Sequence, residues 1–485
     1  MIGETCAAAF TLVIAAYYSI HTRAAVVDPD IWWHIRVGDW IAAHKAVPRT
    51  GIFSQHIERG WVAYSWGFDV LVSSVHALWG LPGIVGLLIC FQVVISLIFL
   101  LAMRRVAGAG WWPFVIASAA IYAFYLNPLR PGLFTLLFFT LELLIIFEAE
   151  RRRDGRMLFW TAPVFILWAN THLQFVYGIV VLVLYAAARV YGADKPRESA
   201  TTMFAVVASS VVGSCIGPNG PLPYKVAFEY ATQLGHYQVI QELGALSFRR
   251  PEHFVQLLLL MAACFAVGMR RTPIDDRRST TFRILLLVIT AVVSFRAMRD
   301  SWFVSMASAF IVAEAVALRS GGPSRGHEPA AIRPSVQYAL ATVIALMASF
   351  EMAKRYGLST RELAAIVDRI YPLQATEYVK TAGLRGPLYN DFNWGGFLMY
   401  RLPDMPVSMD PRADLYGPEL FSRSLATANA APAWTADPDL SRANLVLIPE
   451  RYPLAAALSA DPRFRVVYRD HVAVAFVRAH RAGGN

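Results

Sequence analysis

The sequence predicts a polytopic α-helical membrane protein that carries a smaller α/β domain at its C-terminal end. Two observations about composition and pattern lead to this fold class. The chain of 485 residues is 56% hydrophobic and only 16% charged, which lies outside the usual composition of soluble enzymes. Long apolar segments recur as far as residue 350, and from residue 354 onward short strand-like runs alternate with helical ones.

About eleven apolar segments are predicted to enter or cross a bilayer, since a crossing helix needs about 20 mainly apolar residues, or fewer where its end lies inside protein. The first has no basic segment before it and no clear cleavage site, so we expect a retained helix rather than a signal peptide. The segments are 3–20, 81–103, 111–126, 131–147, 157–169, 173–191, 201–216, 254–269, 280–294, 302–318 and 336–350.

These segments divide the chain into two predicted domains. Residues 1–353 are expected to form the membrane domain, with a long first loop at 21–80, and residues 354–485 are expected to form a soluble α/β domain. The tail of about 130 residues is long enough to bury a core of its own.

The basic residues predict the orientation of the chain. The net charge is +10, and most Lys and Arg clusters fall in alternate loops, such as "EAERRRDGR" and "MRRTPIDDRRST". The positive-inside rule then places the N-terminus in the cytoplasm and the long first loop and the tail outside it. No basic stripe interleaved with aromatic residues is present, so nucleic-acid binding is not expected. The four cysteines lie in apolar segments without metal-ligand spacing.

The loops on the predicted outer side differ in kind from the inner ones. They contain "DPDIWWH", "NPLRP", "ANTHLQ" and "FRAMRDSW", which carry carboxylate, imidazole, amide and guanidinium groups. Several flanking segments are short, so their outer ends should lie below the membrane surface, where polar turns need surrounding protein or a water-filled cavity. We therefore expect an outward-facing cavity with polar walls.

A lipid-phosphate-linked sugar would suit such a cavity. Its tail would stay in the bilayer, and Arg is the side chain best suited to bind its phosphate through two hydrogen bonds. Transfer of the sugar to an acceptor hydroxyl needs a base to take the proton, while the leaving phosphate needs its charge stabilised. One carboxylate and one or two arginines would be enough for this reaction.

The pattern "DPDIWWHIRVGDWIAAHKAVPRTGIFS" followed by "WVAYSWGFDVL" resembles the first extracytoplasmic loop of bacterial membrane glycosyltransferases of the GT-C superfamily. That superfamily includes protein O-mannosyltransferases, aminoarabinose transferases and oligosaccharyltransferases. The similarity continues through "NPLRPGLFTLLFF", "LWANTHLQFVYG" and "YNDFNWGGFLMYRL", so it spans most of the chain. It implies a GT-C-like fold, a polyprenyl-phosphate-linked donor, an acceptor glycan, lipid or protein, and a location in the bacterial inner membrane.

By position, the acidic motif of that superfamily matches Asp28 and Asp30, so the resemblance implies that one of them is the catalytic base. We favour Asp30, because Pro29 keeps the residue before it extended and Asp30 leads into a helical segment. The alternative for either residue is a helix cap. Oligosaccharyltransferase relatives bind a divalent cation at this motif, but only two nearby carboxylates are visible, so we expect no obligatory cofactor or metal.

The remaining candidate residues divide by the ligand that each would contact, and each has a structural alternative. For the donor phosphate, the alternatives are an interfacial anchor for the arginines and, for His34, either a hydrogen bond that orients Asp30 or a plain structural hydrogen bond. For the acceptor or sugar, they are a place in the interfacial aromatic belt, helix capping and turn formation. The donor-phosphate candidates are His34, Arg130, Arg296 and Arg299, and the acceptor or sugar candidates are Trp33, Asn170, His172, Asn393, Asp410 and Arg412.

In the tail, strand-like runs are predicted at "GPLYN", "VSMD", "NLVLIP", "FRVVY" and "HVAVAFV", with helices at "LYGPELFSRSLATANA" and "PLAAALSA". No dinucleotide fingerprint, phosphate-binding glycine loop or zinc motif occurs. The first functional hypothesis is an extracytoplasmic sugar transferase. A lipid-linked-substrate flippase or transporter and a non-catalytic envelope scaffold remain alternatives, although no internal repeat of the kind common in transporters is evident.

Overall fold

The structure is a computed structural model of the chain and describes residues 2–22, 24–123, 128–191, 193, 195–232, 243–269, 277–319 and 334–479. Contacts between residues divide the chain into two compact units. The helical unit comprises Met1–Thr22, Gly86–Ala227 and Ile240–Tyr356, and the mixed unit comprises Arg23–Val85, Phe228–Val239 and Gly357–Asn485. The sequence-based division groups the first loop with the membrane helices, whereas the contacts group it with the tail.

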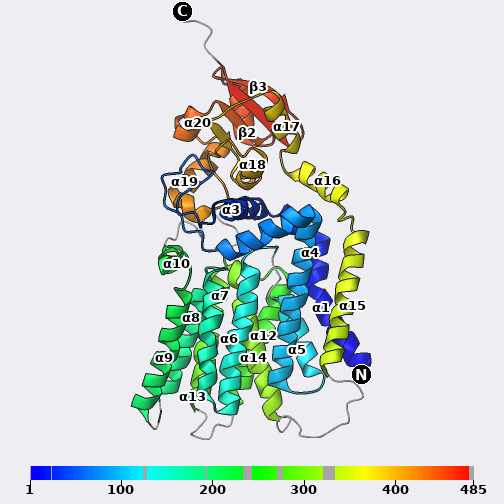
Figure 1. Ribbon diagram of the computed structural model, residues 1–485, viewed down its shortest axis with the longest axis vertical. Coiled ribbons are helices and arrows are strands. Elements are labelled where there is room, and N and C mark those ends of the chain that lie inside the picture. Colours follow the sequence, from blue (N-terminus) through cyan, green and yellow to red (C-terminus); the bar gives the residue numbers. More distant parts are fainter. Residues whose placement is uncertain are drawn as a thin grey trace, which may run out of the picture. The chain divides into compact units, whose positions relative to one another are not determined.

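Helices that lie side by side make up the helical unit, and Figure 1 shows the pairs α1 with α15 and α12 with α14. Two further helices, α4 and α10, begin in one unit and end in the other. The bounds are α1 Ile2–Thr22, α4 Trp66–Ala107, α5 Trp112–Ala123, α6 Gly132–Arg152, η1 Gly155–Trp160, α7 Thr161–Ala169, α8 Phe175–Val190, α9 Pro196–Ser214, α10 Leu222–Thr232, α12 Pro251–Gly268, α13 Arg277–Arg296, η4 Met298–Asp300, α14 Trp302–Arg319 and α15 Pro334–Arg355.

Every predicted apolar segment contains helix, although the end of the segment 111–126 lies outside the described residues. Within the described ranges, 7 helices are long and apolar enough to cross a membrane, and the apolar helices over 112–123, 155–169 and 175–190 are shorter. The protein is therefore a multi-pass helical membrane protein, with fewer full-length spans among these residues than the sequence predicts. In α4 the backbone kinks at Gly80, whose positive φ of 61° is accessible to glycine, two residues before Pro82.

A buried group of charges connects three helices of the helical unit. The fully buried Arg283 of α13 lies 2.5 Å from a carboxylate oxygen of Glu150 on α6 and 2.8 Å from one of Glu314 on α14. Its guanidinium also stacks over the ring of Phe147, 4.4 Å from the ring centre. A buried charge is tolerated only when it is paired, so these contacts specify how α6, α13 and α14 pack.

The mixed unit contains a 4-stranded sheet with the order β1-β2-β4-β3. Strand β1 is parallel to β2, and the other two neighbouring pairs are antiparallel. The bounds of its elements are α2 Ala24–Val27, α3 Asp30–His44, α16 Thr360–Ile370, α17 Leu373–Thr381, β1 Leu388–Asn390, η5 Phe392–Trp394, α18 Gly395–Arg401, α19 Ala413–Ala428, η6 Trp434–Ala436, α20 Pro438–Arg442, β2 Leu445–Pro449, α21 Pro453–Ala460, β3 Phe464–Arg469 and β4 Ala473–Arg478.

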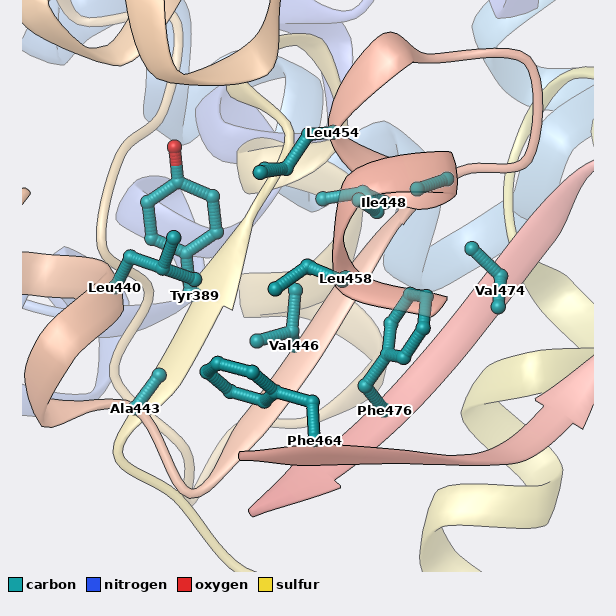
Figure 2. Packing of buried hydrophobic residues seen from close by; sticks show 11 residues of the cluster. Tyr389, Leu440, Ala443, Val446, Ile448, Leu454, Leu458, Phe464, Val474 and Phe476 are labelled. Atoms are coloured by element: carbon teal, nitrogen blue, oxygen red, sulfur yellow. The ribbon is translucent and has the colours of Figure 1, made fainter. Parts of the chain in front are cut away.

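The sheet is built around β2, an uninterrupted apolar run whose residues are all buried. Such runs are typical of strands covered on both faces. Figure 2 shows Phe464 and Phe476 packing beside Val446 of β2 and Leu458 of α21. This cluster is the hydrophobic core of the α/β part of the unit.

Four of the five predicted strands are present, and the prediction of a strand at "VSMD" is wrong. Val407 makes only an isolated bridge with Ser54. Next to it, the Ser408 N–H donates to the side-chain oxygen of Asn390 at 2.8 Å. The segment therefore uses its backbone groups to join the first loop to β1, and no ladder of strand hydrogen bonds forms.

The first loop and the tail share many hydrogen bonds within the mixed unit. The Gln55 amide donates to the carbonyl oxygens of Leu388, at 2.5 Å, and Pro406, at 3.1 Å. The Tyr371 hydroxyl donates to the carbonyl of Val27 at 3.0 Å. Each of these bonds joins residues that are more than 300 positions apart, so the loop and the tail are expected to fold as one cooperative body.

We expect Phe476→Ala to destabilise the mixed unit by about 3–5 kcal/mol, because it removes a fully buried ring and leaves a cavity in the core. The matched control is Val466→Ala on the edge strand β3, where the side chain is 37% exposed. Thermal unfolding of the purified protein in detergent would compare them. Equal melting temperatures for the two variants would contradict this account of the core.

Candidate functional site

The acidic motif lies at the start of α3, and its two carboxylates have different surroundings. Asp28 is buried, and its Oδ1 accepts the backbone N–H of Asp30 at 2.9 Å. A short Asp side chain often closes a turn in this way. Asp30 is partly exposed, and its Oδ1 lies 3.4 Å from the indole nitrogen of Trp33, which donates to it. Asp28 therefore orders the turn, and Asp30 is the more accessible carboxylate.

The imidazole of His34 lies inside the protein, where it contacts a carboxylate that the sequence analysis did not select. Its Nδ1 is 2.5 Å from Oδ1 of Asp69 on α4, and the same oxygen accepts the hydroxyl of Ser65 at 3.2 Å. The side chain of His34 is 3% exposed and that of Asp69 is 0% exposed. The sequence contains a signal for this contact, because Asp69 lies within the apolar segment "WGFDVLV". A carboxylate that is buried with such a segment needs a polar partner.

Trp33 lies between the acidic motif and two other rings. Its ring centre is 3.6 Å from that of His34, and Trp61 meets it edge-on at 6.2 Å. The side chain is buried, so little of its face is available to stack on a sugar. Its indole N–H instead contacts Asp30.

Two of the candidate residues in the tail form a buried ion pair. Arg412 donates from Nε and Nη2 to the two carboxylate oxygens of Asp410, at 2.8 Å each. Its Nη2 also donates to the carbonyl of Ile52 at 2.9 Å, and its guanidinium stacks 4.6 Å from the ring centre of Trp61. Both side chains of the pair are fully buried. Asn393, by contrast, is exposed in η5.

In the helical unit, Arg296 and Arg299 flank the buried carboxylate of Asp300. Arg296 is exposed at the end of α13, Arg299 is partly exposed in η4, and the charges of both act on Asp300. Asp300 accepts hydrogen bonds from the Gln174 amide at 2.6 Å and from the Tyr177 hydroxyl at 2.8 Å. The structure thus brings the segment "FRAMRDSW" together with Gln174, the last residue of "ANTHLQ", and with Tyr177, three residues after it.

The other three candidates of the helical unit lie at helix ends. The Asn170 amide donates to the carbonyls of Ile166 and Ile216, which matches the capping alternative. His172 Nδ1 lies 2.7 Å from the hydroxyl of Thr135 near the start of α6. Arg130 is partly exposed two residues before α6 begins.

Among the residues that the structure describes, no group of three or more His, Cys, Asp or Glu side chains is arranged to hold a metal ion. At the acidic motif, Asp28 is buried and already accepts a backbone N–H. The carboxylate of Asp28 is therefore already engaged in the turn, and Asp30 is the partly exposed carboxylate of the motif.

No protein-family model matches the sequence, and no curated protein is significantly similar to it. The archaeal oligosaccharyltransferase AglB from Archaeoglobus fulgidus, in complex with an inhibitory peptide and a dolichol-phosphate, is a structural match with a TM-score of 0.56 at 12% identity, covering 98% of this chain and 74% of that one. An Archaeoglobus fulgidus oligosaccharyltransferase in complex with Zn and sulfate matches with a TM-score of 0.51 at 12% identity, and the match covers 96% of this chain and 73% of that one. ArnT from Cupriavidus metallidurans, bound to undecaprenyl phosphate, gives a TM-score of 0.45 at 13% identity, covering 98% of both chains.

The chain therefore has the fold of the GT-C glycosyltransferases over nearly its whole length, which confirms the fold that the sequence resemblance predicts.

The carboxyl group of Asp414, which accepts the indole N–H of Trp61 at 3.0 Å, is expected to make stability depend on pH. Burial raises its pKa from the ordinary value of 3.8 to about 6, although the charge of Arg412 and the Trp61 N–H lower it. Between these two values the unfolded chain loses the proton more readily than the folded protein does, so the free energy of unfolding decreases as pH rises.

We expect Asp414→Asn to remove this part of the pH dependence. The melting temperature of the wild type, relative to that of the variant, should fall between about pH 4 and pH 6 and then level off. Melting curves recorded in detergent across this range would test it. Parallel pH profiles for the two proteins would show that Asp414 titrates as it does in the unfolded chain.

Proposed function

We propose that this protein is an integral membrane glycosyltransferase that moves a sugar from a polyprenyl-phosphate-linked donor to an acceptor on the extracytoplasmic side. The observation that carries the proposal is the partly exposed carboxylate of Asp30 at the start of α3, oriented by the Asp28 turn and the Trp33 N–H. It occurs in a chain with the fold of a known oligosaccharyltransferase.

In the proposed reaction, an acceptor hydroxyl attacks the anomeric carbon of the sugar, and Asp30 accepts the proton of that hydroxyl. The new bond joins the acceptor oxygen to the anomeric carbon, and the bond from that carbon to the phosphate oxygen breaks. The lipid phosphate leaves with the electron pair. A positioned general base of this kind contributes about 10²- to 10⁴-fold to the rate.

The phosphate needs cationic partners as it leaves, and we assign this role to Arg130, Arg296 and Arg299. A guanidinium matches the geometry of a phosphate and keeps its charge at all relevant pH values. The exposure of Arg296 and the partial exposure of the other two support the assignment. The dolichol-phosphate in the AglB complex is consistent with a lipid phosphate as a ligand of this fold.

The candidate residues for the acceptor and sugar differ in accessibility. Asn393 is exposed, and Asn170 and His172 are partly exposed, so we retain them as candidate contacts. The burial of Trp33, His34, Asp410 and Arg412 favours supporting roles for those residues. The charge pattern of the loops supports a bacterial inner-membrane location with the N-terminus in the cytoplasm.

We expect Asp30→Asn to lower turnover by about 100-fold or more while donor binding persists, because the amide cannot accept the proton. The assay would offer a panel of radiolabelled polyprenyl-phosphate sugars to the protein in nanodiscs and follow release of lipid phosphate. The control is Asp39→Asn on the same helix, where the carboxylate accepts the Ser73 hydroxyl at 2.5 Å. Donor binding without turnover in the wild type would favour a carrier or scaffold and leave Asp30 as a structural residue.

We expect Arg130→Gln to raise the KM for the donor by about 10- to 100-fold, since one charge-assisted contact to the phosphate is worth about 1.5–3 kcal/mol. Arg197→Gln, at an exposed position in the first turn of α9, is the matched control. Initial rates measured across donor concentrations would separate KM from kcat. If both KM and kcat are unchanged by the Arg130 substitution, this residue is removed from the phosphate site.

A further inference from the structure

The tail contains the same Asp-Pro-Arg turn twice, at residues 410–412 and at residues 461–463. In both turns the Arg backbone N–H donates to the Asp Oδ1, at 3.0 Å in the first and 2.9 Å in the second. In both, Nε and Nη2 of the Arg donate to the Asp carboxylate. The local sequence therefore explains the ion pair itself but not its surroundings.

The two turns differ in what surrounds them. The Arg463 side chain is 44% exposed, whereas the Arg412 side chain is 0% exposed. An exposed pair of this kind contributes little to stability, but a buried guanidinium needs a counter-ion and further stabilising contacts. The compensation for Arg412 comes from the first loop, through the carbonyl of Ile52 and the face of Trp61.

Two series of contacts lead from Arg412 to the side chain of Trp33. In the first, the guanidinium stacks on Trp61, and Trp61 meets Trp33 edge-on. In the second, which begins with an electrostatic influence at a distance and not a contact, the charge of Arg412 acts on Asp69, Asp69 contacts His34, and the imidazole lies tilted against the ring of Trp33. Both series end one hydrogen bond away from Asp30, because the Trp33 indole N–H donates to its carboxylate.

The backbone of the acidic motif is also packed against the tail. A Cβ atom on Gly396, in the first turn of α18, would lie 3.0 Å from the carbonyl oxygen of Pro29 and 3.1 Å from the backbone nitrogen of Trp33. The motif therefore has little room to move toward α18. The rings of His34 and Trp61, which contact Trp33, then set the orientation of its side chain.

From these contacts we infer that Arg412 is a positioning residue for Asp30 and acts through Trp61 and Trp33. The inference rests on the proposed function, since it takes Asp30 as the base. The guanidinium itself is fully buried, so a substrate does not reach it, and its effect is exerted through the protein. A displacement of a catalytic group by about 1 Å can lower the rate by about 100-fold, so a positioning residue affects kcat more than KM.

The test compares Arg412→Lys with Arg463→Lys, the same substitution in the same local turn. Lys keeps the charge, which limits unfolding, but it cannot form the fork to Asp410 or stack in the same way on Trp61. We expect kcat of the Arg412 variant to fall by about 10- to 100-fold with donor KM within about twofold, and the Arg463 variant to match the wild type.

A second measurement does not depend on turnover. Hydrogen–deuterium exchange of the backbone amides of residues 30–36 should become faster in Arg412→Lys and stay unchanged in Arg463→Lys. Trp61→Leu leaves the Asp410–Arg412 fork in place and should also lower kcat and speed the exchange of residues 30–36. It replaces Arg412→Lys as the test variant if Arg412→Lys does not fold.

The outcomes separate the inference from the proposed function. Unchanged exchange at residues 30–36 in both the Arg412 and Trp61 variants would overturn the positioning role, whatever the activity. A higher donor KM with kcat intact would overturn it as well, because it would make Arg412 a substrate ligand. Faster exchange in the Arg412 and Trp61 variants would support the mechanical link even if the wild type shows no turnover with any donor. That absence of turnover would refute the proposed reaction.

Discussion

The buried guanidinium of Arg412 is the constraint on which the organisation of the mixed unit depends. A cation removed from water is tolerated only with a counter-ion, hydrogen-bond acceptors and polarisable surroundings. Asp410 supplies the counter-ion, and the first loop supplies the carbonyl of Ile52 and the ring of Trp61. The tail therefore cannot bury this charge without the loop, and this explains why two segments far apart in the sequence form one compact body.

Close packing of backbone against backbone strengthens the same arrangement. Gly396 lies against the turn that carries the acidic motif, and a Cβ atom on Gly38 of α3 would lie 2.1 Å from the carbonyl oxygen of Asp69. Side chains at these two positions would push α3 away from α18 and from the start of α4. The helix that begins with Asp30 is thus held on two faces, and its first turn has a defined position.

The surroundings of Asp28 and Asp30 show how two adjacent acids acquire separate roles. Asp28 uses its carboxylate to close the turn, which removes it from solvent, and Asp30 keeps its carboxylate accessible. The same principle applies in the helical unit, where buried Arg283 and Asp300 are both compensated by neighbouring side chains. In each case burial turns a charged residue into an organising group, and the partly exposed charges remain accessible to solvent.

The sequence by itself determined the helical membrane class, the helical character of the apolar segments, four strands of the tail and the position of the acidic motif, because each depends on local periodicity or on neighbouring residues. The tertiary structure alone decided which polar groups are buried. Identical Asp-Pro-Arg turns end in opposite environments, and His34 finds Asp69, 35 residues away, inside the protein. Burial depends on which distant surface covers a residue, and no local pattern in the sequence encodes that surface.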